Sequence, residues 1–175
     1  MFEKISYEQW IKDAKKNTSL SDEEIKLAYE KIKIPTRGSE YSAGYDFYLP
    51  YDYKLSSDQS IILTGIRWNC LDEYPADNIK YHIPNKALFL FARSSTAKKY
   101  GFALLNRVGI VDMDYYQADN EGHIMLLVDK KAALSEYEFE AGERIAQGVI
   151  MPFFTDPSDT IIGKSRVGGF GSTGT

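Results

Sequence analysis

From Pro35 onward, the sequence is a succession of short apolar runs rich in β-branched and aromatic residues, and turn-forming residues separate them. The clearest runs are Ser60–Trp68, Ala87–Ala92, Phe102–Val111, His123–Val128 and Arg144–Phe154. Several short strands at this spacing are typical of a β-sandwich or β-barrel. Since 175 residues suffice for one domain with a real core, the sequence predicts a single all-β domain.

The segment before Pro35 has a helical pattern instead. Ser6–Gln9 and Ser21–Glu24 each have the form of a helical capping box, and apolar residues at helical spacing follow each box. We therefore predict two short helices, which form an N-terminal helical extension over residues 1–33. Packing of this extension on the main domain is favoured over its use as a partner-binding hairpin.

Composition narrows the function classes. The formal net charge of -4 gives no sign of a nucleic-acid binder. Cys70 is the single cysteine, so an intrachain disulfide is impossible, and we expect a buried thiol in a reducing compartment. The first ten residues are too charged for a signal peptide, and no apolar run approaches the roughly 18 residues of a membrane span. These features predict a cytoplasmic protein that does not enter membranes.

Two segments could contact a ligand or an anion. In Ser42–Asp46, a glycine beside an aspartate suits a close approach to a ligand or metal, although aspartates are also common turn formers. Arg93–Lys98 follows a strand and begins a short helix, so its hydroxyls, amides and guanidinium could bind an anion. A plain helix N-cap at Ser94 or Ser95 is the simpler alternative.

Two further segments place polar groups on strands. In Asn106–Tyr115, Asp112 and Asp114 would point to the same face if the strand continued, and a solvated hairpin tip is the alternative. In Gly142–Ile150, Gln147 lies among apolar residues and therefore needs a hydrogen-bond partner, which could be the backbone.

The last segment, Arg166–Thr175, is rich in glycine. Its backbone amides and the hydroxyls of Ser172 and Thr173 could bind phosphate oxygens. The aromatic ring of Phe170 could stack on a base, and a tail without function is the alternative.

The order and spacing of these five segments resemble the five motifs of the trimeric dUTPase family over residues 34–175. The stretch between Tyr115 and Ile124 is longer than in most members and resembles dUTPases of Gram-positive bacteria and their phages. The resemblance implies a jelly-roll type β-barrel over residues 34–162 and a flexible lid over residues 163–175. It also implies a homotrimer with three active sites shared between subunits.

The activity implied is the Mg²⁺-dependent hydrolysis of dUTP to dUMP and pyrophosphate, which limits uracil in DNA and supplies dUMP for dTMP synthesis. Asp112 matches the catalytic carboxylate that activates water, and Asp46 matches an acidic residue near the metal that acts through water. The matching substrate-binding positions of the barrel are Arg93, Ser94, Ser95, Asn106, Gly109, Tyr115, Ile124, Met125 and Gln147. The matching positions of the tail are Arg166, Phe170, Gly171, Ser172 and Thr173.

Within this set the implied roles differ. Ile124 and Met125 would read uracil through their backbones, and Tyr115 would pack under the deoxyribose and exclude a 2′-hydroxyl. Arg93, Ser94, Ser95 and Gln147 would contact phosphates from neighbouring subunits. Arg166 precedes Phe170 by four positions, where many members have five, which puts its arginine-finger role in doubt.

Two rival functions remain. A dCTP deaminase shares the fold and an Arg-Ser-Ser motif, but it uses a glutamate on the strand after the hairpin, and Ile124–Val128 contains no carboxylate. A nucleotide-sensing regulatory protein could use the long hairpin or the N-terminal helices to hold a protein partner. Release of pyrophosphate, of ammonia or of neither distinguishes these functions.

Overall fold

The computed structural model describes residues 1–55, 61–70, 86–129, 136–156 and 158. The helices are α1 (Tyr7–Asn17), α2 (Asp22–Lys31), α3 (Ser94–Tyr100) and the 3-10 helix η3 (Met113–Gln117). The strands are β1 (Phe2–Lys4), β2 (Thr36–Arg37), β3 (Gly44–Tyr48), β4 (Tyr53–Lys54), β5 (Ile61–Trp68), β6 (Lys86–Ala92), β7 (Gly109–Val111), β8 (Ile124–Leu127), β9 (Glu138–Phe139) and β10 (Arg144–Pro152).

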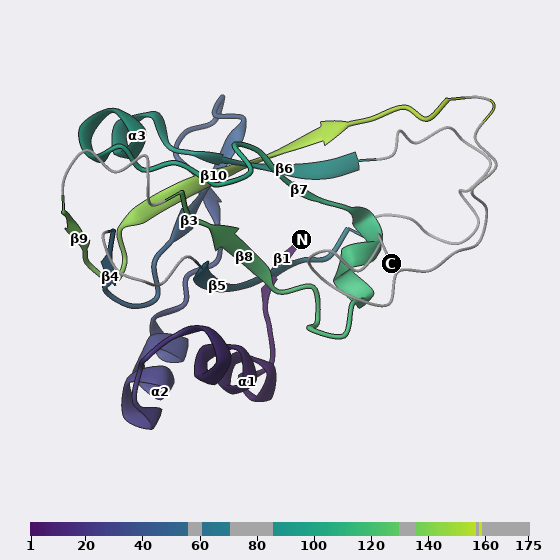
Figure 1. Cartoon of the computed structure of the whole chain (residues 1–175). Coiled ribbons are helices and arrows are strands. Elements are labelled where there is room, and N and C mark those ends of the chain that lie inside the picture. The colour runs from purple at the N-terminus through teal and green to yellow at the C-terminus, as the bar shows by residue number, and fades with distance from the viewer. Residues whose placement is uncertain (56–60, 71–85, 130–135, 157, 159–175) are drawn as a thin grey trace.

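Two antiparallel sheets form the body of the molecule (Figure 1). The larger sheet has the order β2-β3-β10-β6-β7, and the smaller one has the order β1-β5-β8. A two-stranded ribbon of β4 and β9 lies at one end (Figure 1). The all-β prediction is confirmed, and the arrangement is jelly-roll-like.

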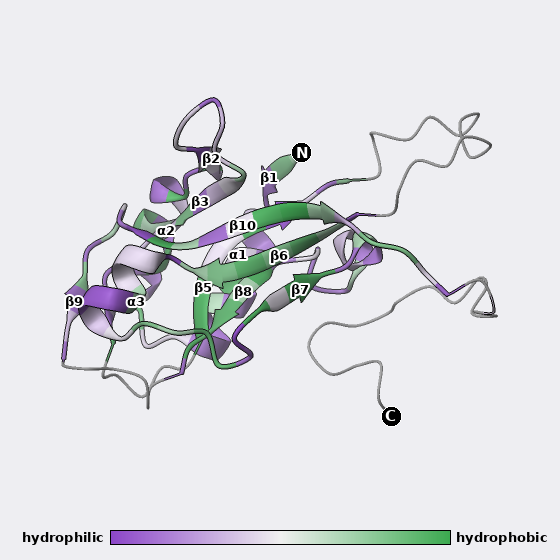
Figure 2. Cartoon of the chain, turned by 90° about the horizontal axis from the view of Figure 1, so that it is seen from above, coloured by the Kyte–Doolittle hydropathy of each residue, from purple (hydrophilic) through white to green (hydrophobic). Residues whose placement is uncertain are grey.

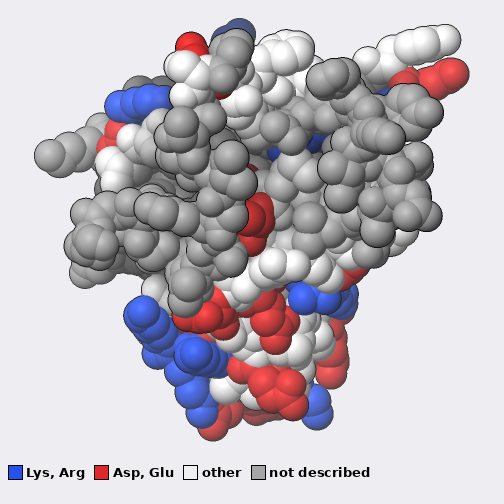
Figure 3. Space-filling model, turned by 90° about the vertical axis from the view of Figure 1, so that its right-hand side faces the viewer, with Lys and Arg blue, Asp and Glu red and all other residues white. Residues whose placement is uncertain are grey.

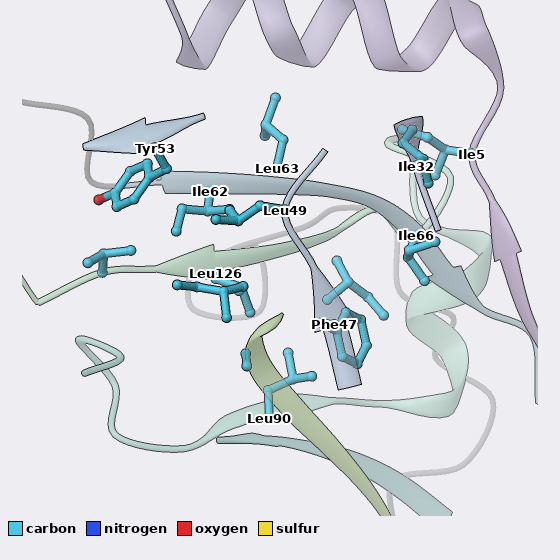
Figure 4. Close-up of a cluster of buried hydrophobic side chains, with 14 of the residues drawn as sticks. Ile5, Ile32, Phe47, Leu49, Tyr53, Ile62, Leu63, Ile66, Leu90 and Leu126 are labelled. Carbon is cyan, nitrogen blue, oxygen red and sulfur yellow. The ribbon is translucent and has the colours of Figure 1, made fainter. Parts of the chain in front are cut away.

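The hydrophobic core lies between the two sheets. Ile62 and Leu126 of the smaller sheet face Phe47 and Leu90 of the larger one (Figure 4), and all four side chains are buried. The apolar residues concentrate in the central strands β5, β6, β8 and β10 (Figure 2). Burying each such side chain contributes about 1.5–3 kcal/mol, so this layer accounts for much of the stability.

Strand β5 is buried on both of its faces. Ile62 points into the core between the sheets, whereas Leu63 points toward α1 (Figure 4), and both side chains have 0% exposure. The helical pair thus covers the outer face of the smaller sheet, as expected for helices that pack on the main domain. This double burial explains why β5 is nearly continuously apolar instead of alternating.

The N-terminal segment is tied to the domain more closely than its sequence indicates. β1 pairs with β5, so the first residues belong to the smaller sheet, which the helical pattern did not predict. On α1, Trp10 is fully buried, and its indole Nε1 donates to the carbonyl oxygen of Ile25 at 2.8 Å. The boundary near residue 33 remains a prediction, because one core includes side chains from both sides of it.

The two predicted capping boxes differ. At α2 the box is complete, because Glu24 N–H donates to Ser21 Oγ at 3.3 Å and Ser21 N–H donates to Glu24 Oε2 at 2.7 Å. At α1, Ser6 Oγ accepts from Gln9 N–H at 3.1 Å, but the amide of Ser6 donates to Glu121, a residue 115 positions away, at 2.8 Å. A carboxylate of the long hairpin therefore caps the first helix.

The strand predicted over Phe102–Val111 is wrong for most of its length, because only β7 is a strand there. Leu104 forms a single bridge with Val128, and the chain then turns at Arg107, whose φ is 58°. The Asp129 carboxylate binds the Arg107 guanidinium at 2.9 Å and holds this left-handed turn.

Cys70 is buried, as predicted, and its thiol lies 3.6 Å from the carbonyl oxygen of Met113. Among the described residues, no helix has the length and apolar character needed to cross a membrane.

Candidate active site

One cavity gathers the residues predicted to bind the nucleoside. It has a volume of about 70 Å³ and lies between β6, β7, η3 and β8. Its lining residues are Leu90, Asn106, Gly109, Ile110, Val111, Tyr115, Ile124 and Met125. All five predicted nucleoside positions are therefore brought together, although they span 20 positions of the chain.

Tyr115 forms a fixed wall of this cavity. Its side chain is buried, and its hydroxyl donates to the carbonyl oxygen of His123 at 2.8 Å. The same hydroxyl accepts from the side-chain amide of Asn120 at 2.8 Å. Both contacts come from the long hairpin, so the hairpin sets the position of the ring.

The backbone of β8 presents polar groups to the cavity at Met125. The carbonyl of Ile124 accepts from Thr64 Oγ1 at 2.5 Å and so points toward β5. The carbonyl of Leu127 accepts from Leu105 N–H at 2.8 Å on the opposite edge of β8. Because residues two apart in a strand direct their main-chain groups to the same edge, Met125 faces that opposite edge, beside the cavity. Met125 is thus the better placed of the two predicted base-reading residues.

Asp112 does not line the cavity, but it directly follows the lining residue Val111 in the chain and comes three positions before the lining residue Tyr115. β7 ends at Val111, and Asp112 becomes the N-cap residue of η3 with an exposed side chain. The chain therefore leaves the strand before Asp112, so the condition under which both carboxylates would share a strand face is not met. Both side chains are exposed, in keeping with the alternative of a solvated hairpin.

A second cavity contains the cationic residues. It has a volume of about 410 Å³ beside α3 and the start of β10. Its lining residues are Tyr48, Arg93, Ser95, Thr96, Lys99, Tyr100, Gly142, Glu143 and Arg144. Among the described residues, none lines both cavities, and α3 and β7 lie apart in Figure 1. Within one subunit, the predicted phosphate contacts are therefore not assembled with the predicted nucleoside contacts.

Asp46 holds two guanidinium groups at the second cavity. Its Oδ1 accepts from Arg93 Nε at 2.9 Å, and its Oδ2 accepts from Arg144 Nη1 at 3.1 Å. Asp46 itself is buried on β3, directly opposite Gln147 of β10. The first of these ion pairs fixes the direction of Arg93, and the role of Asp46 near a metal, through water, remains a proposal.

The N-terminus of α3 is formed by the Arg-Ser-Ser segment. Arg93 is the N-cap residue and makes no side-chain capping bond, so the alternative of Ser94 or Ser95 as N-cap is wrong. Ser94 and Ser95 are exposed in the first turn, and Arg93 Nη1 donates to Ser95 Oγ at 3.3 Å. The hydroxyls and the first amides of the helix are therefore presented to solvent, as an anion site requires.

Gln147 is partly buried against β3. A methyl group built on Gly44 would lie 2.9 Å from Gln147 Oε1, so the amide of Gln147 packs closely over this glycine. The remaining predicted residues, Arg166, Phe170, Gly171, Ser172 and Thr173, lie outside the described residues.

Sequence patterns did not indicate the residues that support Tyr115. His123 is fully buried; its Nδ1 lies 2.7 Å from Asp13 Oδ2, and its Nε2 accepts from Gly65 N–H at 2.9 Å. Because Gly65 donates to Nε2, the neutral ring carries its proton on Nδ1 and donates it to Asp13. Asp13 and His123 are 110 positions apart, which explains why no local motif indicates them.

This buried histidine predicts a loss of stability in mild acid. Burial lowers the pKa of His123 below its ordinary value, against the opposing effect of the Asp13 carboxylate. As pH falls below about 6.5, the unfolded chain takes up a proton that the folded chain does not, so stability falls by up to about 1.4 kcal/mol per pH unit. Urea unfolding between pH 7.5 and 5.5 measures this slope, and His123→Gln should flatten it. An equally steep slope in the variant would assign the acid sensitivity to other groups.

Comparison with known proteins identifies the family of this chain. The dUTPase family model matches residues 30–174. The deoxyuridine 5′-triphosphate nucleotidohydrolase of Lactococcus lactis is 37% identical over 146 residues, which cover 82% of this chain and 89% of that relative.

Solved structures show the same fold. A dUTPase from Streptococcus mutans superimposes with a TM-score of 0.55 at 31% identity, covering 89% of this chain and 97% of that one. A mutant dUTPase from Staphylococcus aureus phage phi11, described with a structural Mg(II) ion, has a TM-score of 0.55 at 18% identity and covers 78% and 94%. The predicted likeness to Gram-positive bacterial and phage proteins is confirmed.

Proposed function

Because this chain belongs to the dUTPase family, we propose that it is a dUTP diphosphatase, which hydrolyses dUTP to dUMP and pyrophosphate. The observation that carries the proposal is the convergence of Asn106, Gly109, Tyr115, Ile124 and Met125 on one cavity. Asp112 directly follows the lining residue Val111, and we place the attacking water between its carboxylate and the α-phosphate of a bound nucleotide.

The proposed reaction is attack of water on the α-phosphorus. Asp112 orients this water and accepts its proton, because water is a poor nucleophile until a base removes its proton. Pyrophosphate leaves as the new P–O bond forms, so positive groups must neutralise the triphosphate. Arg93, held in place by Asp46, is the described residue best prepared for that task.

We propose that Mg²⁺ is bound mainly by the phosphate oxygens of the substrate and only to a small extent by protein side chains. Among the described residues, no group of three or more His, Cys, Asp or Glu side chains converges on one point. Mg²⁺ is commonly held by substrate phosphates, waters and one or two carboxylates, which suits this sparse supply of ligands. When bound, it would neutralise phosphate charge, and Asp46 would act near it through water.

We further propose that the active sites are shared between subunits of a homotrimer. The separation of the nucleoside cavity from Arg93 and Ser95 supports this assembly, because a second subunit must bring the cationic cavity to the nucleotide. Ser94 and Gln147 are assigned to the same phosphate contacts. Sedimentation should show a stable trimer, and a fully active monomer would exclude the shared-site proposal.

The C-terminal residues complete the proposal from the family pattern. Phe170 is assigned to stacking on uracil, and Gly171, Ser172 and Thr173 are assigned to phosphate contacts. Arg166 is assigned to the triphosphate, although it precedes Phe170 by four positions instead of five. Deletion of residues 166–175 should reduce turnover and leave the melting temperature unchanged.

Parallel assays of pyrophosphate and ammonia release test the function. With dUTP, dCTP and UTP as substrates, we expect pyrophosphate from dUTP alone. Ammonia from dCTP would identify a deaminase of the same fold. Tight dUTP binding without either product would identify a nucleotide sensor, with the helical pair as the candidate partner surface.

Substitution of Tyr115 should weaken the choice of deoxyribose over ribose. Tyr115→Ala removes the ring proposed to lie under the sugar, so kcat/KM for UTP relative to dUTP should rise roughly 10-fold or more. Tyr115→Phe keeps the ring and loses only the bonds to His123 and Asn120, so its ratio should be intermediate. An unchanged ratio in Tyr115→Ala would place the discrimination elsewhere.

A further inference from the structure

A chain of hydrogen bonds connects the first helix to the wall of the nucleoside cavity. On α1, Asp13 Oδ2 accepts from Gln9 Nε2 at 2.9 Å and from the His123 ring at 2.7 Å. The carbonyl of His123 accepts from the Tyr115 hydroxyl at 2.8 Å. The connection from α1 to the Tyr115 ring therefore runs through the Asp13 side chain, the His123 side chain and the His123 carbonyl group. Tyr115 is the ring proposed to pack under the sugar.

The other side of His123 is fixed by an irregularity in β5. The pairing of β5 with β8 shifts register between Leu63 and Ile66, and Gly65 in this bulge has a φ of 69°. The bulge turns Gly65 N–H out of the ladder and onto His123 Nε2 at 2.9 Å. A methyl group at Gly65 would lie 2.2 Å from Ile32 Cδ1, so this glycine also permits the close approach of the helical segment.

A second contact joins the same helix to the same hairpin. Both carboxylate oxygens of Glu121 are bound at the start of α1: Oε2 accepts from Ser6 N–H at 2.8 Å, and Oε1 accepts from Ser6 Oγ at 2.6 Å. Glu121 has a φ of 57°, which is costly for a residue other than glycine, and Gly122 follows with a φ of 68°. A methyl group at Gly122 would lie 2.7 Å from the carbonyl oxygen of Tyr115, so this left-handed turn folds the hairpin directly against Tyr115.

We propose that α1 is a positioning element of the nucleoside site, in which Asp13, acting through His123, and Ser6, acting through Glu121, hold Tyr115 against the sugar. This inference rests on the proposed function, because it gives the N-terminal helix a part in sugar selectivity. The outer surface of the helical pair is covered by charged groups of both signs (Figure 3), whereas its inner face is bound to the hairpin. Asp13 and Ser6 are positioning residues and do not touch substrate.

The main test compares two substitutions at Asp13. Asp13→Leu replaces the carboxylate with a larger apolar side chain and removes the acceptor of the His123 proton, so the hairpin should loosen. We expect the UTP-to-dUTP ratio of kcat/KM and the KM for dUTP to rise roughly 3- to 30-fold, with kcat for dUTP nearly unchanged. Asp13→Asn retains an acceptor oxygen, so its UTP-to-dUTP ratio of kcat/KM and its KM for dUTP should both stay close to those of the wild-type protein.

A matched pair of N-cap variants provides the control. Ser6→Ala and Ser21→Ala each remove a capping hydroxyl, but only Ser6 contacts the hairpin. Both variants should lose a similar amount of stability, and only Ser6→Ala should change the UTP-to-dUTP ratio. Equal ratios in the two variants, together with a wild-type ratio in Asp13→Leu, would overturn the proposal. If Asp13→Leu does not fold, the Ser6 and Ser21 pair decides alone.

A measurement without substrate separates this inference from the proposed function. In wild-type protein, ¹⁵N-edited NMR should show a protected proton on His123 Nδ1. Asp13→Leu should lose that protection and shift the ring resonances of Tyr115, whether or not dUTP is hydrolysed. Unmoved Tyr115 resonances would contradict the positioning role, while absent turnover with the expected shifts would contradict the enzymatic proposal alone.

Discussion

Asp112→Asn should lower dUTP turnover by roughly two to four orders of magnitude, because a positioned general base typically contributes about 100- to 10,000-fold. The substitution preserves the size of the side chain and some hydrogen bonding, so nucleotide affinity should change far less than kcat. Asp112 is exposed at the N-cap of η3, so the fold should be unaffected. Single-turnover kinetics with dUTP, together with equilibrium binding of a non-hydrolysable analogue, separate the two quantities.

Asp114→Asn is the matched control for this experiment. Asp114 lies two positions further on, inside η3, and its side chain is also exposed. Because β7 ends before Asp112, the two carboxylates do not share a strand face, so Asp114→Asn should affect assembly or stability more than chemistry. Loss of turnover in a folded Asp114→Asn trimer, with Asp112→Asn active, would assign the base to Asp114.

Trp10→Ala should cost about 3–5 kcal/mol of unfolding free energy, because it opens a cavity in a fully buried layer. The indole packs among the rings of Tyr29, Tyr51 and His123, with centroid distances of 6.3, 6.4 and 6.1 Å. Its loss also leaves the carbonyl of Ile25 without the indole donor. Urea unfolding followed by circular dichroism measures the change.

Tyr7→Ala on the same helix is the control for Trp10→Ala. Tyr7 contacts Tyr29 with a centroid distance of 5.0 Å, but its side chain is 38% exposed, so we expect a loss below about 1 kcal/mol. If the two variants have equal stability, the helical pair unfolds independently of the barrel. In that case the burial of β5 beneath α1 would not contribute to global stability.

The local elements could be predicted because their signals lie within a few residues. Capping boxes at Ser6 and Ser21 predicted the two N-terminal helices, and apolar runs predicted β5, β6, β8 and β10. The order of the motifs also indicated the family and the lining of the nucleoside cavity. Each of these features depends on neighbouring side chains, helical or strand periodicity, or a fixed spacing along the chain.

Errors arose where a distant contact overrode a local pattern. Phe102–Val111 is apolar enough for a continuous strand, yet the Arg107–Asp129 ion pair accompanies a left-handed turn within it. β1 is too short to show the alternation of a strand. It is a strand because it pairs with the edge of β5. Asp112 and Asp114 do not alternate on a strand, because β7 ends at Val111 and η3 begins at Met113.

By itself, the sequence determined the all-β architecture, the helical start and a set of five residues that line one cavity. The tertiary structure alone decided that Arg93 and Ser95 line a different cavity from Tyr115, and that the backbone groups of Met125 point to the edge of β8 away from β5. It also decided that Asp13 binds His123 across 110 positions. The physical reason is that such contacts depend on how sheets and helices pack against one another. Contacts between residues far apart in the chain produce no periodic pattern in the sequence.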